Sequence, residues 1–228
     1  MLSGTTTRRT ILMLVSGVLA LAVVAPVSAQ TQTLNPGVFD PGSKIYGKTY
    51  GEWSARWWQW VASIPSGSNP LPDETGANCG VGQSGPVWFL AGNFGGTTTR
   101  SCTVPSNRAI LYPILNSICW RPSDFVTEQE GRDCAAYYMN LASNLATQVD
   151  RVPLHSLPRY RTGSPIFSFT MPPDNIFGLG PPLTRDGISD GFWIMLAPLS
   201  PGAHRIHFHG EIPSASFVVD VTYNLTVQ

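Results

Sequence analysis

The sequence predicts a mainly β fold, an antiparallel jelly-roll-like sandwich with two inserted or flanking α-helices. The 228-residue chain contains 22 glycines and 20 prolines, and only 12% of its residues are charged. Such a composition is typical of short strands joined by many turns. Several short segments alternate between apolar and polar residues, whereas two longer segments have a helical period.

The first 29 residues are similar to a secretory signal peptide. Arg8 and Arg9 precede an apolar run that ends in small residues, so we expect cleavage before Gln30. An uncleaved membrane anchor is the alternative, but the run is short for a span. We therefore expect a secreted or periplasmic protein with no membrane span after signal cleavage. It would have an extended N-terminal lead-in at 30–44 and a single β-sandwich domain at 45–228.

The clearest helix is predicted over residues 49–64. Thr49 and Glu52 form a T-x-x-E capping box, and Pro65 ends the segment. Glu52 is also a possible catalytic acid, but the capping box already explains its position.

Tryptophans suggest carbohydrate binding, because their large apolar faces can stack on sugar rings. The helical period places Trp53, Trp57 and Trp60 on one face, where we expect them in the core. Trp58 lies off that face, and Trp88 lies in a predicted strand. Trp58 and Trp88 are therefore the expected ligand-binding residues.

The remaining elements follow from apolar runs and turn residues. A second helix is expected from about Ser123, with its clearest part at 132–150. The expected strands are 86–92, 100–105, 108–116, 164–171, 191–196, 204–211 and 216–227.

Four cysteines remain after the leader, and an even number in an exported chain indicates two disulfides. Three pairings are possible. We favour Cys79–Cys102 and Cys119–Cys134, because each pair closes a short local loop. The spacing contains no C-x-x-C motif, which argues against a zinc knuckle or a redox pair.

The last two strands place three histidines beside carboxylates. Alternation puts the odd positions of 205–211 and the even positions of 220–226 on one polar face. One acceptable register pairs His209 with Asp220 and His207 with Thr222. His204 has the opposite parity from the other two histidines.

This polar face is a candidate metal site. His207 and His209 are two residues apart, so their rings can converge on one divalent transition metal, with Asp220 or Glu211 completing the ligand set. The alternatives are a solvated polar face, or histidines that act as acid–base groups without a metal.

The H-x-H strand resembles that of cupins, which are jelly rolls, and this resemblance implies a metal-dependent enzyme. In cupins the glutamate comes several residues after the second histidine, and a later strand adds another histidine. Here Glu211 comes only two residues after His209, and no histidine follows His209. Five blocks also resemble a family of exported bacterial proteins of uncharacterised activity. They are GKTYGEWSARWWQW, GQSGPVWFLAG, RSCTVP, ILYPILN and DGFWIMLAPLSPGAHRIHF.

We expect an exported protein that binds a glycan or another extracellular ligand. Without Arg8 and Arg9 the formal charge changes from +0 to about −2, and no basic stripe indicates nucleic acid as a partner. Whether the protein is an enzyme stays open, as does its oligomeric state. One alternative is the cupin-like metal enzyme, and another is a glycoside hydrolase or lyase with loop carboxylates. The candidate carboxylates are Asp73, Glu74, Asp124, Asp174, Asp186 and Asp190.

Overall fold

The computed structural model describes residues 1, 35, 37–180 and 182–228. The predicted signal peptide beyond Met1 and the cleavage site before Gln30 lie outside the described residues. The segment Thr33–Gln228 forms one compact unit, and all of the description below concerns it. None of the helices in the described part is long and apolar enough to cross a membrane.

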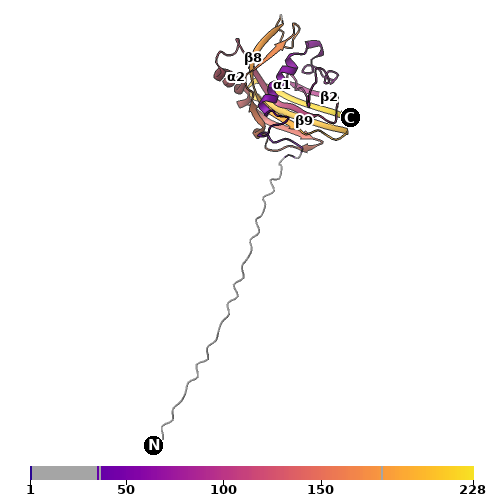
Figure 1. Ribbon diagram of the computed structural model, residues 1–228, viewed down its shortest axis with the longest axis vertical. Helices are drawn as coiled ribbons and strands as arrows, with labels where there is room; N and C mark the ends of the chain where they lie inside the picture. Colours follow the sequence, from indigo (N-terminus) through magenta and orange to yellow (C-terminus); the bar gives the residue numbers. More distant parts are fainter. Residues whose placement is uncertain (2–34, 36, 181) are drawn as a thin grey trace. The chain divides into compact units, whose positions relative to one another are not determined.

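The fold is mainly β with two α-helices, as predicted (Figure 1). The helices are α1 (Tyr50–Ala62) and α2 (Glu128–Asn140). The strands are β1 (Val87–Phe89), β2 (Gly96–Val104), β3 (Ala109–Trp120), β4 (Ser143–Val149), β5 (Val152–Pro153), β6 (Arg161–Gly163), β7 (Phe167–Met171), β8 (Leu183–Leu196), β9 (Gly202–Ile212) and β10 (Phe217–Val227).

The strands form two five-stranded sheets. One has the order β1-β3-β8-β6, with β7 also paired to β8, and the other has the order β2-β10-β9-β4-β5. Each sheet contains a parallel pair, β1 with β3 and β2 with β10. Both sheets are therefore mixed rather than wholly antiparallel. In the first sheet, β1 and β3 can run parallel because β2, which lies between them in the chain, belongs to the second sheet.

The two sheets share one hydrophobic core, consistent with a β-sandwich. Tyr112 of β3 stacks on Phe208 of β9 with ring centroids 5.1 Å apart. The Tyr112 hydroxyl also lies 2.9 Å from Oγ1 of Thr147 in β4. Trp193 of β8 lies on the other face of the first sheet from Tyr112, and its ring centroid is 5.5 Å from that of Trp57 in α1. The first sheet therefore lies between α1 and the second sheet.

Helix α1 begins as the sequence predicts. The Thr49 side chain accepts the backbone N–H of Glu52, and the Glu52 carboxylate accepts the backbone N–H of Thr49. Trp53, Trp57 and Trp60 are all buried, which confirms their predicted place in the core.

Helix α2 differs from its predicted range at both ends. It begins at a second capping box, formed by Thr127 and Glu130, instead of near the predicted Ser123. It ends at Asn140, and Ser143–Val149 is strand β4 rather than more helix. Leu145 and Val149 happen to continue the helical spacing, and this produced the error. The Cys119–Cys134 disulfide joins α2 to β3, as expected.

The described part of the predicted lead-in packs against the domain. Val38 forms an isolated bridge with Leu196, and the Phe39 N–H donates to the carbonyl of Met195. Asn35 is 4% exposed and donates to the His155 carbonyl. This segment therefore extends along the end of β8.

Candidate functional site

The polar face of β9 and β10 has the parity and register that the sequence predicts. Ile206 and Phe208 are fully buried, so the histidines between and after them face outward. His209 pairs with Asp220, and His207 pairs with Thr222. The outer face of the second sheet thus carries the predicted cluster.

The two histidines bind different carboxylates. Nε2 of His207 lies 2.8 Å from Oδ1 of Asp220, and Nε2 of His209 lies 2.9 Å from Oε1 of Glu211. Nδ1 of His207 lies 3.3 Å from the Gln148 amide nitrogen, which is a donor. The His207 ring is therefore held between Gln148 and Asp220.

This arrangement does not favour a shared metal ion. Both Nε2 atoms already bind a carboxylate oxygen, and Nδ1 of His209 also lies 3.8 Å from Oδ2 of Asp220, so the rings gather around Asp220 in a hydrogen-bonded arrangement rather than around a metal ion. Within the described residues, no group of three His, Cys, Asp or Glu side chains could hold a metal. Hydrogen bonds from Asn144 and His209 keep the pKa of Glu211 below its ordinary value. The cluster has the contacts of a hydrogen-bonded polar face.

The candidate catalytic carboxylates mostly have structural contacts. The Asp73 carboxylate accepts the backbone N–H groups of Thr75, Gly76 and Asn78, which order its loop. Asp190 forms a partly buried ion pair with Arg161, at 2.9 Å. The Thr49 backbone N–H and then its hydroxyl lower the pKa of Glu52, which is the wrong direction for a general acid at neutral pH.

The structure does not bring the two predicted ligand-binding tryptophans together. Trp58 is 7% exposed and lines a small cavity beside β3 and β10. Trp88 is 8% exposed and packs beneath Arg108, whose guanidinium lies 5.6 Å from the ring centroid.

A larger groove, which the sequence does not predict, runs along α1. Its volume is about 430 Å³, within the range of roughly 300–1,000 Å³ that is usual for small-molecule sites. Aromatic side chains line it together with polar and basic ones. The lining residues are Lys48, Trp53, Arg56, Gln59, Trp60, Ser63, Gly82, Ser84, Gly85, Pro86 and Phe89. We call this feature the α1 groove.

The α1 groove is electropositive. Lys48 and Arg56 both line it, and neither forms an ion pair with any residue that the structure describes. Glu52 lies in the same helix, but its carboxylate binds the backbone and hydroxyl of Thr49. Among the described residues, the lining therefore carries two cations and no carboxylate, with Glu52 close enough to Lys48 for their charges to interact.

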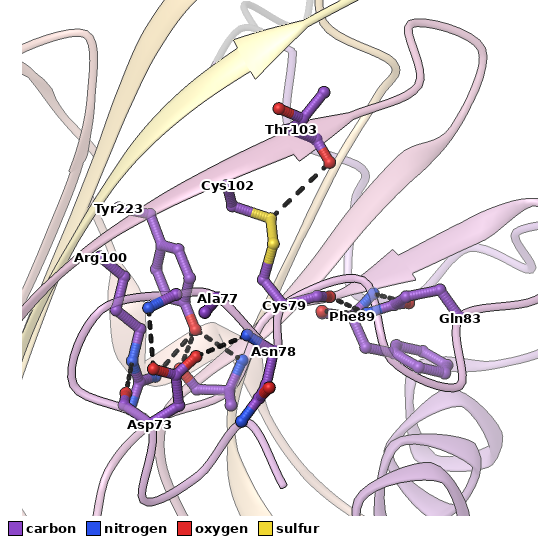
Figure 2. The surroundings of a disulfide bond; sticks show 12 residues. Asp73, Ala77, Asn78, Cys79, Gln83, Phe89, Arg100, Cys102, Thr103 and Tyr223 are labelled. Atoms are coloured by element: carbon purple, nitrogen blue, oxygen red, sulfur yellow. Dashed lines mark hydrogen bonds between the residues drawn. A yellow bond between two sulfur atoms is a disulfide. The ribbon is translucent and has the colours of Figure 1, made fainter. Parts of the chain in front are cut away.

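One wall of the α1 groove is held rigidly. The Gln83 side chain donates to the carbonyls of Cys79 and Phe89 and accepts the Phe89 N–H (Figure 2). The Cys79–Cys102 disulfide, one of the two expected pairs, ties this loop to β2. The loop therefore presents residues 82–86 in a fixed position.

A buried arginine supports the other side of the same disulfide (Figure 2). Arg100 is 1% exposed and donates to the carbonyls of Leu71, Asp73, Ala91 and Gly92 and to the Tyr223 hydroxyl. These bonds join the 71–73 loop and the 91–92 segment to the second sheet.

Comparisons with known proteins add little. No family model matches the sequence, and no curated protein matches it. A solved chain titled "Structure of PbICP-C in complex with falcipain-2" is similar, at 12% identity with a TM-score of 0.25, over 63% of this chain and 100% of that chain. A TM-score this low carries no argument about fold or function.

Proposed function

We propose that this protein is an exported binding protein for an acidic glycan, which it holds in the α1 groove. The observation that carries the proposal is the pair of cations, Lys48 and Arg56, that line the groove beside an aromatic floor. An acidic sugar matches both features, since its carboxylate pairs with the cations and its ring packs on aromatic carbon.

The geometry favours binding by several moderate contacts. An exposed ion pair contributes only about 0–1 kcal/mol, so the cations alone cannot hold a ligand tightly. Trp53, Trp60 and Phe89 form the apolar floor, although each is less than 10% exposed. The indole N–H groups of Trp53 and Trp60 donate to Ile45 and Val81, which fixes both rings. A preformed floor of this kind reduces the ordering cost of binding.

A pair of matched disaccharides tests the proposal. We expect digalacturonate to bind in isothermal titration calorimetry and α-1,4-galactobiose, its neutral analogue, to bind at least tenfold more weakly. Arg56→Gln removes the exposed cation and should weaken digalacturonate binding about two- to fivefold, which corresponds to about 0.4–1 kcal/mol. The affinity should also fall as salt is added.

Arg159→Gln is the matched control, because Arg159 is an exposed arginine that pairs with Asp40 outside the groove. This variant should bind like the original protein. Equal affinity for the two disaccharides, or equal loss in both variants, would contradict an acidic-glycan site in the α1 groove.

A further inference from the structure

Trp58 differs from the other tryptophans of α1 in its hydrogen bonding. The indole N–H groups of Trp53, Trp57 and Trp60 donate to backbone carbonyls at 2.8, 2.9 and 2.9 Å. Nε1 of Trp58 is buried, yet it has no partner among the described residues. Buried tryptophan N–H groups usually find an acceptor, so this exception needs an explanation.

The unpartnered Trp58 lines a cavity of about 160 Å³. Asn116 lines the same cavity, and its amide nitrogen is also buried without a partner among the described residues. The other lining residues are mostly apolar, and none is ionisable. The full set is Trp57, Trp58, Leu71, Gly92, Asn93, Phe94, Pro113, Ile114, Leu115, Asn116, Phe217 and Val219.

A third unpartnered donor lies close to Asn116. Nε1 of Trp193 also lacks a partner among the described residues. A Cβ added to Gly191 would lie 2.7 Å from this nitrogen and 2.8 Å from Cβ of Asn116, so the two side chains meet over the glycine. Three donors without acceptors therefore gather in one region of the core, where each costs about 1–3 kcal/mol if left unbonded.

Asn93 does not supply the missing acceptor. Its side-chain oxygen accepts the Gly95 N–H, and its amide donates to Gly96 and Thr98. These bonds order the turn that carries Phe94, which also lines the cavity and is 56% exposed. Together with the partly exposed Asn93, Asn116 and Phe217, this ring marks the side on which the cavity opens and an apolar ligand can enter.

We propose that this cavity binds a small uncharged ring compound that carries an acceptor oxygen, such as a cyclic ketone or an aromatic ketone. The volume suits one ring, since a cavity of about 150 Å³ is known to admit benzene. The oxygen would accept from Trp58 and Asn116, while the ring packs on Leu115 and Phe94. The absence of ionisable groups among the lining residues selects against charged ligands. This site is independent of the α1 groove.

Acetophenone and ethylbenzene test the inference, because they share a ring and a similar size but only acetophenone has an acceptor. We expect acetophenone to bind about tenfold more tightly in a titration followed by ¹⁵N NMR of the indole N–H signals. The Trp58 signal should move most strongly, since its N–H gains a partner. Trp58→Phe, which keeps a ring and removes one of the two donors, should reduce the preference for acetophenone, with Asn116 left as the remaining donor.

Trp88→Phe is the matched control, because Nε1 of Trp88 is also buried without a partner in the described structure but does not line this cavity. It should keep the preference. Asn116→Asp gives a second test if Trp58→Phe does not fold, since a carboxylate would repel the ketone oxygen and weaken binding. Equal affinity for both compounds, no binding of either, or an unmoved Trp58 signal would overturn the inference.

Discussion

His204 has two acceptors and therefore favours its charged form. Its Nδ1 lies 2.7 Å from Oδ2 of Asp150, and its Nε2 lies 2.9 Å from the carbonyl oxygen of Ser200. Both ring nitrogens can donate only when the imidazole is protonated. Burial lowers the pKa of His204, but the bonds to Asp150 and Ser200 outweigh it, so the pKa lies above 6.5.

This contact predicts a pH-dependent stability. Because the folded pKa exceeds the unfolded value, the contribution is fully present below about pH 6.5 and is lost as the pH rises through the folded pKa. Asp150→Asn should remove most of this dependence. Urea unfolding at pH 5.5 and 8.5 measures it, with His155→Asn as a control that leaves the contact intact. Identical pH slopes in the original protein and Asp150→Asn would refute the assignment.

The β4–β5 hairpin has a strained two-residue turn. Gln148 pairs with Pro153 and Val149 with Val152, which leaves Asp150 and Arg151 as the loop. Both have left-handed backbone conformations, with φ of 51° and 68°. Two-residue hairpin turns of this type favour asparagine and glycine.

Arg151→Gly should therefore stabilise the protein. Left-handed φ costs a side-chain-bearing residue about 1–2 kcal/mol, whereas glycine adds about 0.5–1 kcal/mol of chain entropy. The net expectation is a gain of about 0.5–1 kcal/mol in the free energy of unfolding, measured with urea. Arg185→Gly, in β8, should instead destabilise it. A loss of stability in Arg151→Gly would show that the arginine side chain makes a stabilising contact.

Elements with a strong local pattern could be predicted from the sequence. The Thr49–Glu52 capping box located α1, and strict alternation gave the parity and register of β9 and β10. The order of strands could not be predicted, because neither parallel pair joins strands that are consecutive in the chain. The second helix was misplaced because Leu145 and Val149 fit a helical period although they lie in a strand.

The two disulfides lie in different parts of the molecule. Removing each one in turn therefore distinguishes an effect on stability from an effect on ligand binding. Cys79–Cys102 and Cys119–Cys134 span 23 and 15 residues, so removing either should cost about 3 kcal/mol. Only the first holds the wall of the α1 groove. Replacing Cys79 and Cys102 by alanine should therefore also weaken digalacturonate binding, by an expected fivefold or more.

Replacing Cys119 and Cys134 by alanine is the matched control for that experiment. Thermal melts should show a similar loss of stability, since α2 loses its link to β3, while calorimetry should show unchanged binding. Equal effects of both double variants on affinity would mean that the groove depends on overall stability rather than on its own wall.

The candidate sites themselves could be read from the sequence only in part. Trp58 stood out because it lies off the apolar face of its helix, and it does line a cavity. The α1 groove gave no such signal, because Arg56 comes from α1 whereas Phe89 and Pro86 come from a loop and strand about thirty residues later. Only tertiary packing brings these residues together.

The position of β10 constrains how the chain can fold. This strand lies between β2 and β9, and Gly96 pairs with Val219, more than a hundred residues later. The second sheet therefore cannot be completed until the last strand is available to pair, and until then β2 is an unpaired edge. Long-range pairing of this kind slows folding, so a chaperone that shields β2 would raise the yield of native protein.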